Sequence, residues 1–155
     1  MEANFVRLNK LLAWIVFIGY SACLLYWMFL GFHRGEQTAA ELRYNLIPFR
    51  TIERYFVHFN AFQFEMWVIN IVGNIGVFVP FGWLMPYIFK GCERFWKFSF
   101  IFIAAIVALE LLQTFLRVGS GDVDDVILNY LGAAIGYLLY SVFRWRQDRI
   151  VRVEL

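Results

Sequence analysis

The sequence predicts an all-α polytopic membrane protein: a four-transmembrane-helix bundle with a short amphipathic helix in its first extracytoplasmic loop. Of the 155 residues, 61% are hydrophobic and only 17% are charged, which is more apolar surface than a soluble domain of this size can bury. Charged residues are nearly or wholly missing from 11–32, 66–89, 98–116 and 126–143. Each stretch is about as long as the roughly 20 residues that cross a bilayer. Residues 1–155 are therefore expected to form a single membrane domain.

The basic residues predict how these spans are oriented. Nine of the 14 Lys and Arg residues precede the first span, fill the 90–97 loop or follow the fourth span. Because cytoplasmic loops are enriched in Lys and Arg, we expect a multi-pass membrane protein with both termini in the cytoplasm. The net charge of +2 does not indicate a nucleic-acid partner. Membrane anchoring explains the basic flanks.

The first span is expected to remain in the protein. It is longer than the apolar core of a signal peptide and continues into 24–29 without a small-residue cleavage site. Cys23 and Cys92 fall in different parts of the chain, so they indicate neither a disulfide nor a zinc site.

Residues 33–65 form the long extracytoplasmic loop. From Phe49 onward, apolar side chains recur at helical spacing with charged residues between them, at Phe49, Ile52, Tyr55, Phe56 and Phe59. This pattern predicts a short amphipathic helix lying in the outer membrane interface, with Pro48 at its first position. A connecting helix that only covers the bundle is an equally open interpretation.

The second and fourth spans carry signals for close packing. Asn70 and Asn74 share a helical face, and we favour packing for Asn70 but leave Asn74 open between packing and ligand binding. Pro80 is expected to break the second span. Gly132 and Gly136 form a small-xxx-small pattern that favours close approach of the second or third span.

An ionisable residue, Glu110, lies inside the third span. Its insertion costs about 2.5–3.5 kcal/mol, so such a residue normally has a partner or a function. Gln113 and Arg117 follow at spacings of three and four, which places all three side chains on one face near the outer end of the helix. Glu110 is the strongest single indication of a functional site.

A second set of polar residues begins the fourth span. Asp122, Asp125 and Asn129 also follow helical spacing, and the tight turn 118–121 makes the third and fourth spans antiparallel neighbours. We therefore expect a polar pocket at the outer membrane–water boundary. The complete expected site comprises Arg43, Asn45, Asn74, Glu110, Gln113, Arg117, Asp122, Asp125 and Asn129.

Other roles for these residues stay open. Asp122 and Asp124 suit capping of the fourth span, and Arg117 suits an internal ion pair with Glu110 or Asp125. The carboxylates of Glu110, Asp122 and Asp125 would also suit a hard divalent cation such as Mg²⁺ or Ca²⁺. No nucleophile–base pair is visible, so catalysis would require such a metal, and no catalytic residue is assigned.

Four blocks of the sequence resemble those of the VanZ-like family of small bacterial membrane proteins. They are 43–49, 74–82, 110–113 and the acidic turn 122–125 that leads into Asn129 and Gly132. The family is named for a protein associated with low-level resistance to the glycopeptide teicoplanin, and its biochemical activity is poorly defined. The resemblance implies a location in the bacterial cytoplasmic membrane. The resemblance implies a family polar core at Asn74, Glu110, Gln113, Asp122, Asp125 and Asn129. It also lends weight to Asn45 and Pro48.

Three functions follow as hypotheses. The leading one is a cell-envelope protein, non-enzymatic or of unassigned activity, whose outer-leaflet polar site binds a membrane lipid, a lipid-linked wall precursor or a lipoglycopeptide. The second is a metal-dependent hydrolase or transferase that acts on lipid phosphates. The third is a structural membrane bundle without a ligand, in which the polar residues only hold the helices together.

Overall fold

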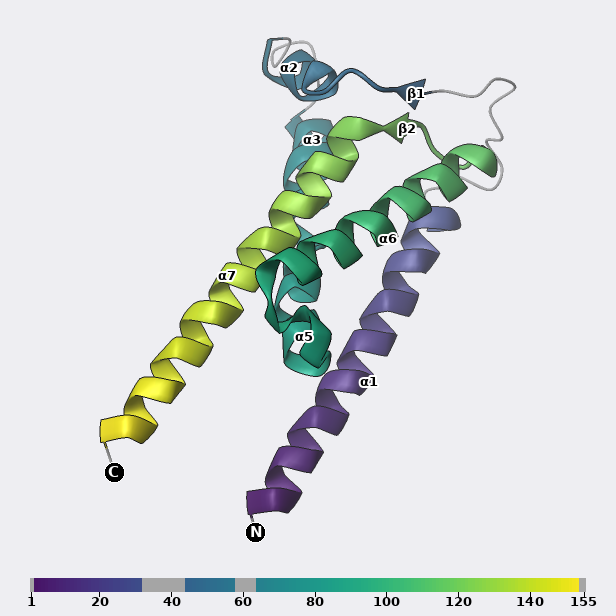
Figure 1. Ribbon diagram of the computed structural model, residues 1–155. Coiled ribbons are helices and arrows are strands. Elements are labelled where there is room, and N and C mark those ends of the chain that lie inside the picture. The colour runs from purple at the N-terminus through teal and green to yellow at the C-terminus, as the bar shows by residue number, and fades with distance from the viewer. Residues whose placement is uncertain (1, 32–43, 58–63, 154–155) are drawn as a thin grey trace.

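Four long helical stretches dominate the computed structural model, which describes residues 2–31, 44–57 and 64–153. The stretches long and apolar enough to cross a membrane are Arg7–Phe29, Val68–Ile88, Phe95–Phe115 and Val123–Gln147. The predicted all-α membrane bundle is therefore confirmed, with span boundaries within a few residues of those expected. Both chain ends lie at one end of the bundle, and α2, α3 and the two short strands lie at the other (Figure 1).

The first helix, α1 (Glu2–Phe29), packs on the bundle through aromatic rings. Phe17 meets Phe81 and Phe89 edge to face, with ring centroids 5.7 Å apart in each pair. Its outer face carries exposed apolar side chains such as Leu11 and Ile15. A helix that is apolar all round suits a lipid surrounding, where the outward side chains contact acyl chains.

The second span is segmented. It consists of α3 (Phe64–Trp67), the π-helix η2 (Val68–Gly73), α4 (Asn74–Gly76) and α5 (Val79–Ile88). The break predicted at Pro80 lies at Val77 and Phe78, and Pro80 is accepted in the first turn of α5, where its missing N–H is not needed. The hydroxyl of Tyr20 donates a 2.9 Å hydrogen bond to the Val77 carbonyl at this break.

The fourth span, α7 (Val123–Val153), approaches the second span backbone to backbone. A Cβ atom added to Gly132 would lie 2.0 Å from the carbonyl oxygen of Ile75, and one added to Gly136 would lie 2.0 Å from that of Val79. The glycine pair therefore serves packing within the bundle, against the second span. Deeper in the bundle lies a core that includes Phe78, Phe98, Phe102, Ile106 and Ala133.

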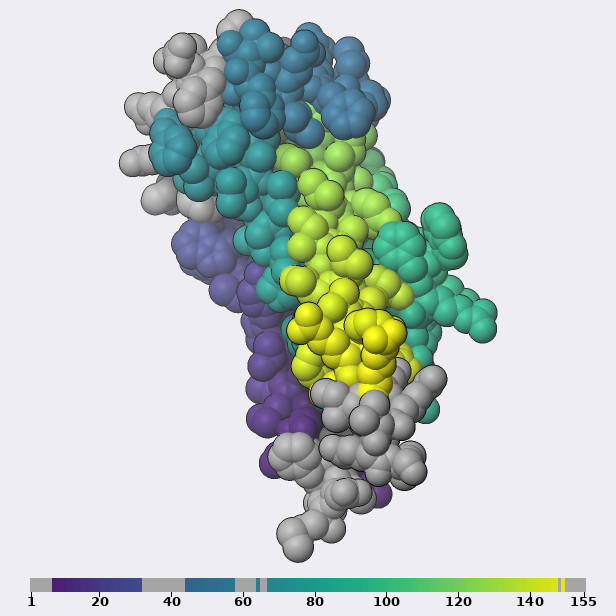
Figure 2. All heavy atoms as spheres, turned by 90° about the vertical axis from the view of Figure 1, so that its left-hand side faces the viewer, coloured from purple at the N-terminus to yellow at the C-terminus, as the bar shows by residue number. Residues whose placement is uncertain are grey.

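The third span, α6 (Phe95–Phe115), follows the short 3-10 helix η3 (Lys90–Glu93). In Figure 1 the C-terminal ends of α1 and α6 approach each other, while α7 runs from β2 toward the C-terminus. Figure 2 shows α7 extending along one face, with α2 over its N-terminal end.

The helix expected in the long loop is α2 (Arg50–Val57), and it exposes Phe56 and Val57. It begins two residues after Pro48, so the expected placement of Pro48 at its first position is wrong. Phe49 separates the two, and its positive φ of 65° interrupts the helical backbone there. The expected Phe59 lies outside the described residues.

Two short strands lie at the end of the bundle opposite the chain termini (Figure 1). β1 (Tyr44–Asn45) pairs in parallel with β2 (Gly121–Asp122), which directly precedes α7. The sequence analysis did not predict this pairing. It joins the long loop to the turn between the third and fourth spans.

Candidate functional site

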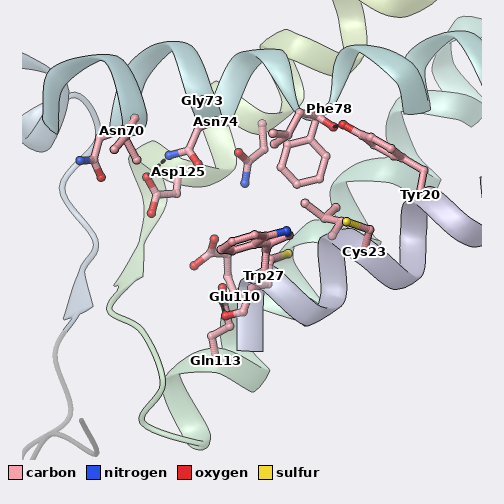
Figure 3. Close-up of a pocket in the computed structure, with 15 residues that line it drawn as sticks. Tyr20, Cys23, Trp27, Asn70, Gly73, Asn74, Phe78, Glu110, Gln113 and Asp125 are labelled. Carbon is pink, nitrogen blue, oxygen red and sulfur yellow. Dashed lines mark hydrogen bonds between the residues drawn. The ribbon is translucent and has the colours of Figure 1, made fainter. Parts of the chain in front are cut away.

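A cavity of about 450 Å³ lies where α6 ends and α7 begins, walled by α1, the second span, α6 and α7. Five residues expected in the polar site line it, namely Asn74, Glu110, Gln113, Asp125 and Asn129. Figure 3 shows side chains from all sides of this cavity, including Tyr20, Trp27 and Phe78 from its apolar part. The cavity thus combines polar groups with aromatic and aliphatic walls inside a membrane bundle.

Asn74 and Asp125 connect two walls of the cavity. The side-chain amide of Asn74 donates a 2.8 Å hydrogen bond to the Asp125 carboxylate (Figure 3). Asn74 is the first residue after the π-helix, whose Asn70 and Gly73 also line the cavity. A π-helical turn is wider than an α-helical turn and is frequent at functional sites.

Glu110 and Gln113 project from α6 into a buried setting, with exposed fractions of 8% and 5%. The Gln113 side-chain amide donates a 2.8 Å hydrogen bond to the carbonyl of Met28 at the end of α1. Helix ends leave carbonyls without intrahelical partners, so this bond both satisfies one and ties α1 to α6.

Asn129 is the most buried polar side chain on the cavity wall, with an exposed fraction of 2%. Its Oδ1 atom is buried and has no hydrogen-bond partner among the described residues. A buried acceptor left unsatisfied costs about 1–3 kcal/mol.

Asp122 was expected to share a helical face with Asp125, but it lies in β2, before α7 begins, and does not line the cavity. Its carboxylate accepts hydrogen bonds from the Asn45 amide at 3.1 Å and the Thr51 hydroxyl at 2.6 Å. It also accepts the backbone N–H of Asp124 at 2.9 Å, which caps the start of α7. Asp122 therefore fastens the long loop to α7.

Asp124 is completely buried, and it caps a different helix from the one expected. Its carboxylate accepts the backbone N–H groups of Thr51 at 2.7 Å, of Ile52 at 3.1 Å and of Phe49. These groups lie at the N-terminus of α2, whose partial positive charge favours a carboxylate. The prediction that Asp124 would cap the fourth span is thus wrong, because its side chain turns to α2.

The remaining expected residues lie elsewhere. Arg117 is exposed in the turn after α6, where its φ of 57° ends the helical spacing from Gln113, and it does not line the cavity. Asn45 lies in β1 and binds Asp122 and Thr51. Arg43 lies outside the described residues.

The expected metal ligands are not assembled. Within 2–31, 44–57 and 64–153, no group of three or more His, Cys, Asp and Glu residues is positioned to hold a metal ion. Asp122 is directed toward Asn45 and Thr51, while Glu110 and Asp125 line the cavity. The described geometry therefore does not combine these three carboxylates for Mg²⁺ or Ca²⁺.

α2 brings a tyrosine close to the acidic end of α7. Burial raises the pKa of the Tyr55 hydroxyl, the carboxylates of Asp125 and Asp122 raise it further, and Arg54 partly opposes them.

Sequence reasoning missed the contribution of α1. Tyr20, Cys23, Trp27 and Met28 line the cavity, but they lie in an apolar span that gave no site signal. Asn70 was assigned to packing, although it lies on the cavity wall. The signal available in the sequence was the shared helical face of Asn70 and Asn74. The π-helix that positions Asn70 has no recognisable sequence pattern.

Comparisons with known proteins identify relatives. The family model described as VanZ/LLP1 matches residues 17–144. The chain is also 26% identical over 102 residues to Protein VanZ of Enterococcus faecium, an alignment that covers 66% of this chain and 63% of that protein. The chain thus spans less than two thirds of the length of this curated relative. No solved structure matches.

Proposed function

Because the chain belongs to the VanZ/LLP1 family, we propose that it is a multi-pass protein of the bacterial cytoplasmic membrane whose outer cavity binds the polar head of an amphiphile. The amphiphile is a membrane lipid, a lipid-linked wall precursor or a lipoglycopeptide such as teicoplanin. One observation carries this proposal: Asn129 lines the 450 Å³ cavity, and its buried Oδ1 has no hydrogen-bond partner among the described residues.

The lining of the cavity supports a head group that donates hydrogen bonds. Its described residues include the acidic Glu110 and Asp125 and no Lys, Arg or His. Carboxylate and amide oxygens accept hydrogen bonds, so hydroxyl or ammonium groups complement them. Sugars and amines carry such groups.

The distribution of basic residues supports an outward-facing cavity. Lys90 and Arg94 lie between the second and third spans, Lys97 lies in the first turn of α6, and further Arg residues lie in the C-terminal part of α7. The cavity lies at the opposite end, where α6 ends and α7 begins. Positive charge on the cytoplasmic side would place this end in the outer leaflet. Alkaline phosphatase fused after the C-terminus should remain inactive, whereas activity there would reverse the assignment.

Binding can be tested with Asn129→Leu, because leucine has a similar size and removes the unsatisfied oxygen. Purified protein in phosphatidylcholine nanodiscs is heated with and without teicoplanin, which carries a fatty acyl chain. A ligand at 100 times its Kd stabilises the folded state by about 2.7 kcal/mol. We expect teicoplanin to raise the apparent Tm of the wild type and to have little effect on Asn129→Leu.

Asn9→Leu is the matched control, since Asn9 lies near the start of α1 and does not line the cavity. This variant should keep the full response to teicoplanin. The same three proteins, at equal membrane levels in a susceptible Gram-positive host, should show whether binding is accompanied by teicoplanin protection beyond any effect on vancomycin. Equal thermal responses in wild type and Asn129→Leu would contradict the proposed site and favour a structural role for Asn129.

A further inference from the structure

A second cavity of about 430 Å³ lies deeper in the bundle, between α1, α5 and α6. Its walls are almost entirely hydrocarbon, including Phe17, Met85 and Leu109. The lining hydroxyl of Ser21 already donates a 2.7 Å hydrogen bond to the carbonyl of Phe17. This apolar groove therefore has no described polar group that requires a polar ligand.

The apolar groove adjoins the polar cavity. Leu24 of α1 and Phe78 of the second span line both. On α6 the polar cavity uses Glu110 and Gln113, whereas the groove also extends to Phe102, about two turns farther from the outer end. Polar lining at the end of the spans thus passes into apolar lining toward their middle.

The groove also opens sideways. Leu25 on α1 and Leu112 on α6 are 41% and 46% exposed, and Ala105 and Ala108 on α6 are exposed as well. These residues belong to two helices long and apolar enough to cross a membrane, so their exposed faces would meet lipid. A ligand in the surrounding bilayer could enter between α1 and α6 without crossing water.

We propose that the polar cavity and the apolar groove form one site for an amphiphile of the surrounding membrane. Its donor-bearing head lies in the cavity and one acyl chain lies in the groove, after entry between α1 and α6. The proposal rests on the function proposed above and adds the position of the chain and the route of entry. The acyl chain supplies the dispersion contacts that an unfilled apolar groove lacks.

The test uses phosphatidylcholine nanodiscs that contain a small fraction of phosphatidylethanolamine with a photoreactive diazirine in one acyl chain. The ammonium of this lipid donates hydrogen bonds, and the same labelled chain on phosphatidylcholine provides a head without N–H donors. After irradiation, mass spectrometry locates the adducts. We expect the ethanolamine probe to label Leu25, Ala105 and Ala108 more strongly than the outward-facing Phe100, and the choline probe to show a weaker preference.

Ala108→Trp fills the groove with a large side chain and should reduce groove labelling about tenfold, a change equivalent to about 1.4 kcal/mol. Ala104→Trp is the matched control, because Ala104 is exposed on α6 but lines neither the groove nor the polar cavity. Labelling in this control should stay close to that of the wild type. Adducts on the wild type also provide a measurement that does not depend on the folding of either variant.

The outcomes separate the two proposals. Wild-type adducts spread evenly over the lipid-facing surface would overturn the groove site, even if the teicoplanin response still depends on Asn129. Groove labelling that is unchanged in Ala108→Trp would also overturn it. Strong groove labelling together with no Asn129-dependent binding would instead contradict the proposed cavity function. The groove would then bind an acyl chain without the polar cavity.

Discussion

Asn74 and Asp125, 51 positions apart in the chain, are joined by a 2.8 Å hydrogen bond from the Asn74 amide to the Asp125 carboxylate. The bond links α4 to the first turn of α7 on the wall of the polar cavity. Hydrogen bonds between membrane helices contribute about 0.6 kcal/mol on average and about 1.7 kcal/mol at most. Its main consequence is orientation, since it fixes one oxygen of a carboxylate that lines the site.

Exchanging the two groups tests this relationship. Asn74→Asp should lower the apparent Tm in detergent, because it sets two carboxylates against each other. Adding Asp125→Asn restores one donor and one acceptor, so the double variant should recover about 1 kcal/mol of the loss. A double variant no more stable than Asn74→Asp would show that the two side chains are not coupled.

The attachment of α2 should depend on Asp124. In Asp124→Asn the carboxylate that accepts N–H groups from Phe49, Thr51 and Ile52 is lost, and each unsatisfied group costs about 1–3 kcal/mol. A total of about 3 kcal/mol would increase hydrogen exchange at the Thr51 and Ile52 amides roughly 100-fold. Glu53→Gln on the exposed face of α2 should leave this exchange nearly unchanged. Equal protection in both variants would refute the role of Asp124.

Close packing between α7 and the second span should not tolerate a methyl group. Gly132→Ala would place Cβ 2.0 Å from the Ile75 carbonyl oxygen, so we expect a loss of about 1–3 kcal/mol, seen as a lower apparent Tm. Gly19→Ala makes the same change in α1, where nothing lies within 4 Å, and should be neutral or slightly stabilising. Similar Tm values for the two variants would contradict the backbone contact.

The break in the second span should depend modestly on α1. Tyr20→Phe removes the hydroxyl that donates to Val77, and we expect a loss of about 0.5–1.5 kcal/mol in thermal unfolding. Tyr26→Phe, on an exposed position of the same helix, is the control and should change stability little. An equally large loss of stability in Tyr26→Phe would mean that the hydrogen bond from Tyr20 to Val77 has no specific effect.

Hydrophobic length predicted the four spans because crossing a bilayer constrains length and composition strongly. Helical spacing also predicted which polar residues meet where the helix continues, as for Glu110 with Gln113 and Asp125 with Asn129. It failed at Asp122, since α7 begins one residue later. Spacing applies only within a helix, and the sequence fixes helix ends less sharply than helix interiors.

Other features depend on tertiary contacts that a single sequence does not reveal. Asp124 looked like a cap for its own helix, but its carboxylate binds α2, more than 70 positions earlier in the chain. Trp27 and Met28 line the cavity although they differ in no visible way from the other apolar residues of their span. Their position on the cavity wall depends on how α1 packs against the neighbouring helices.

The attachment of the loop by Asp122 and Asp124 has a consequence for biosynthesis. Asn45 and Thr51 bind Asp122, which the ribosome adds 77 and 71 positions later, respectively. At a translation rate of about 5–20 residues per second, Asp122 is added roughly 4–15 seconds after these loop residues. Until the acidic turn has been synthesised, β1 has no β2 strand to pair with. The cavity is thus among the last parts of the protein to be completed, and a nascent chain stalled before the fourth span would carry an unfinished site.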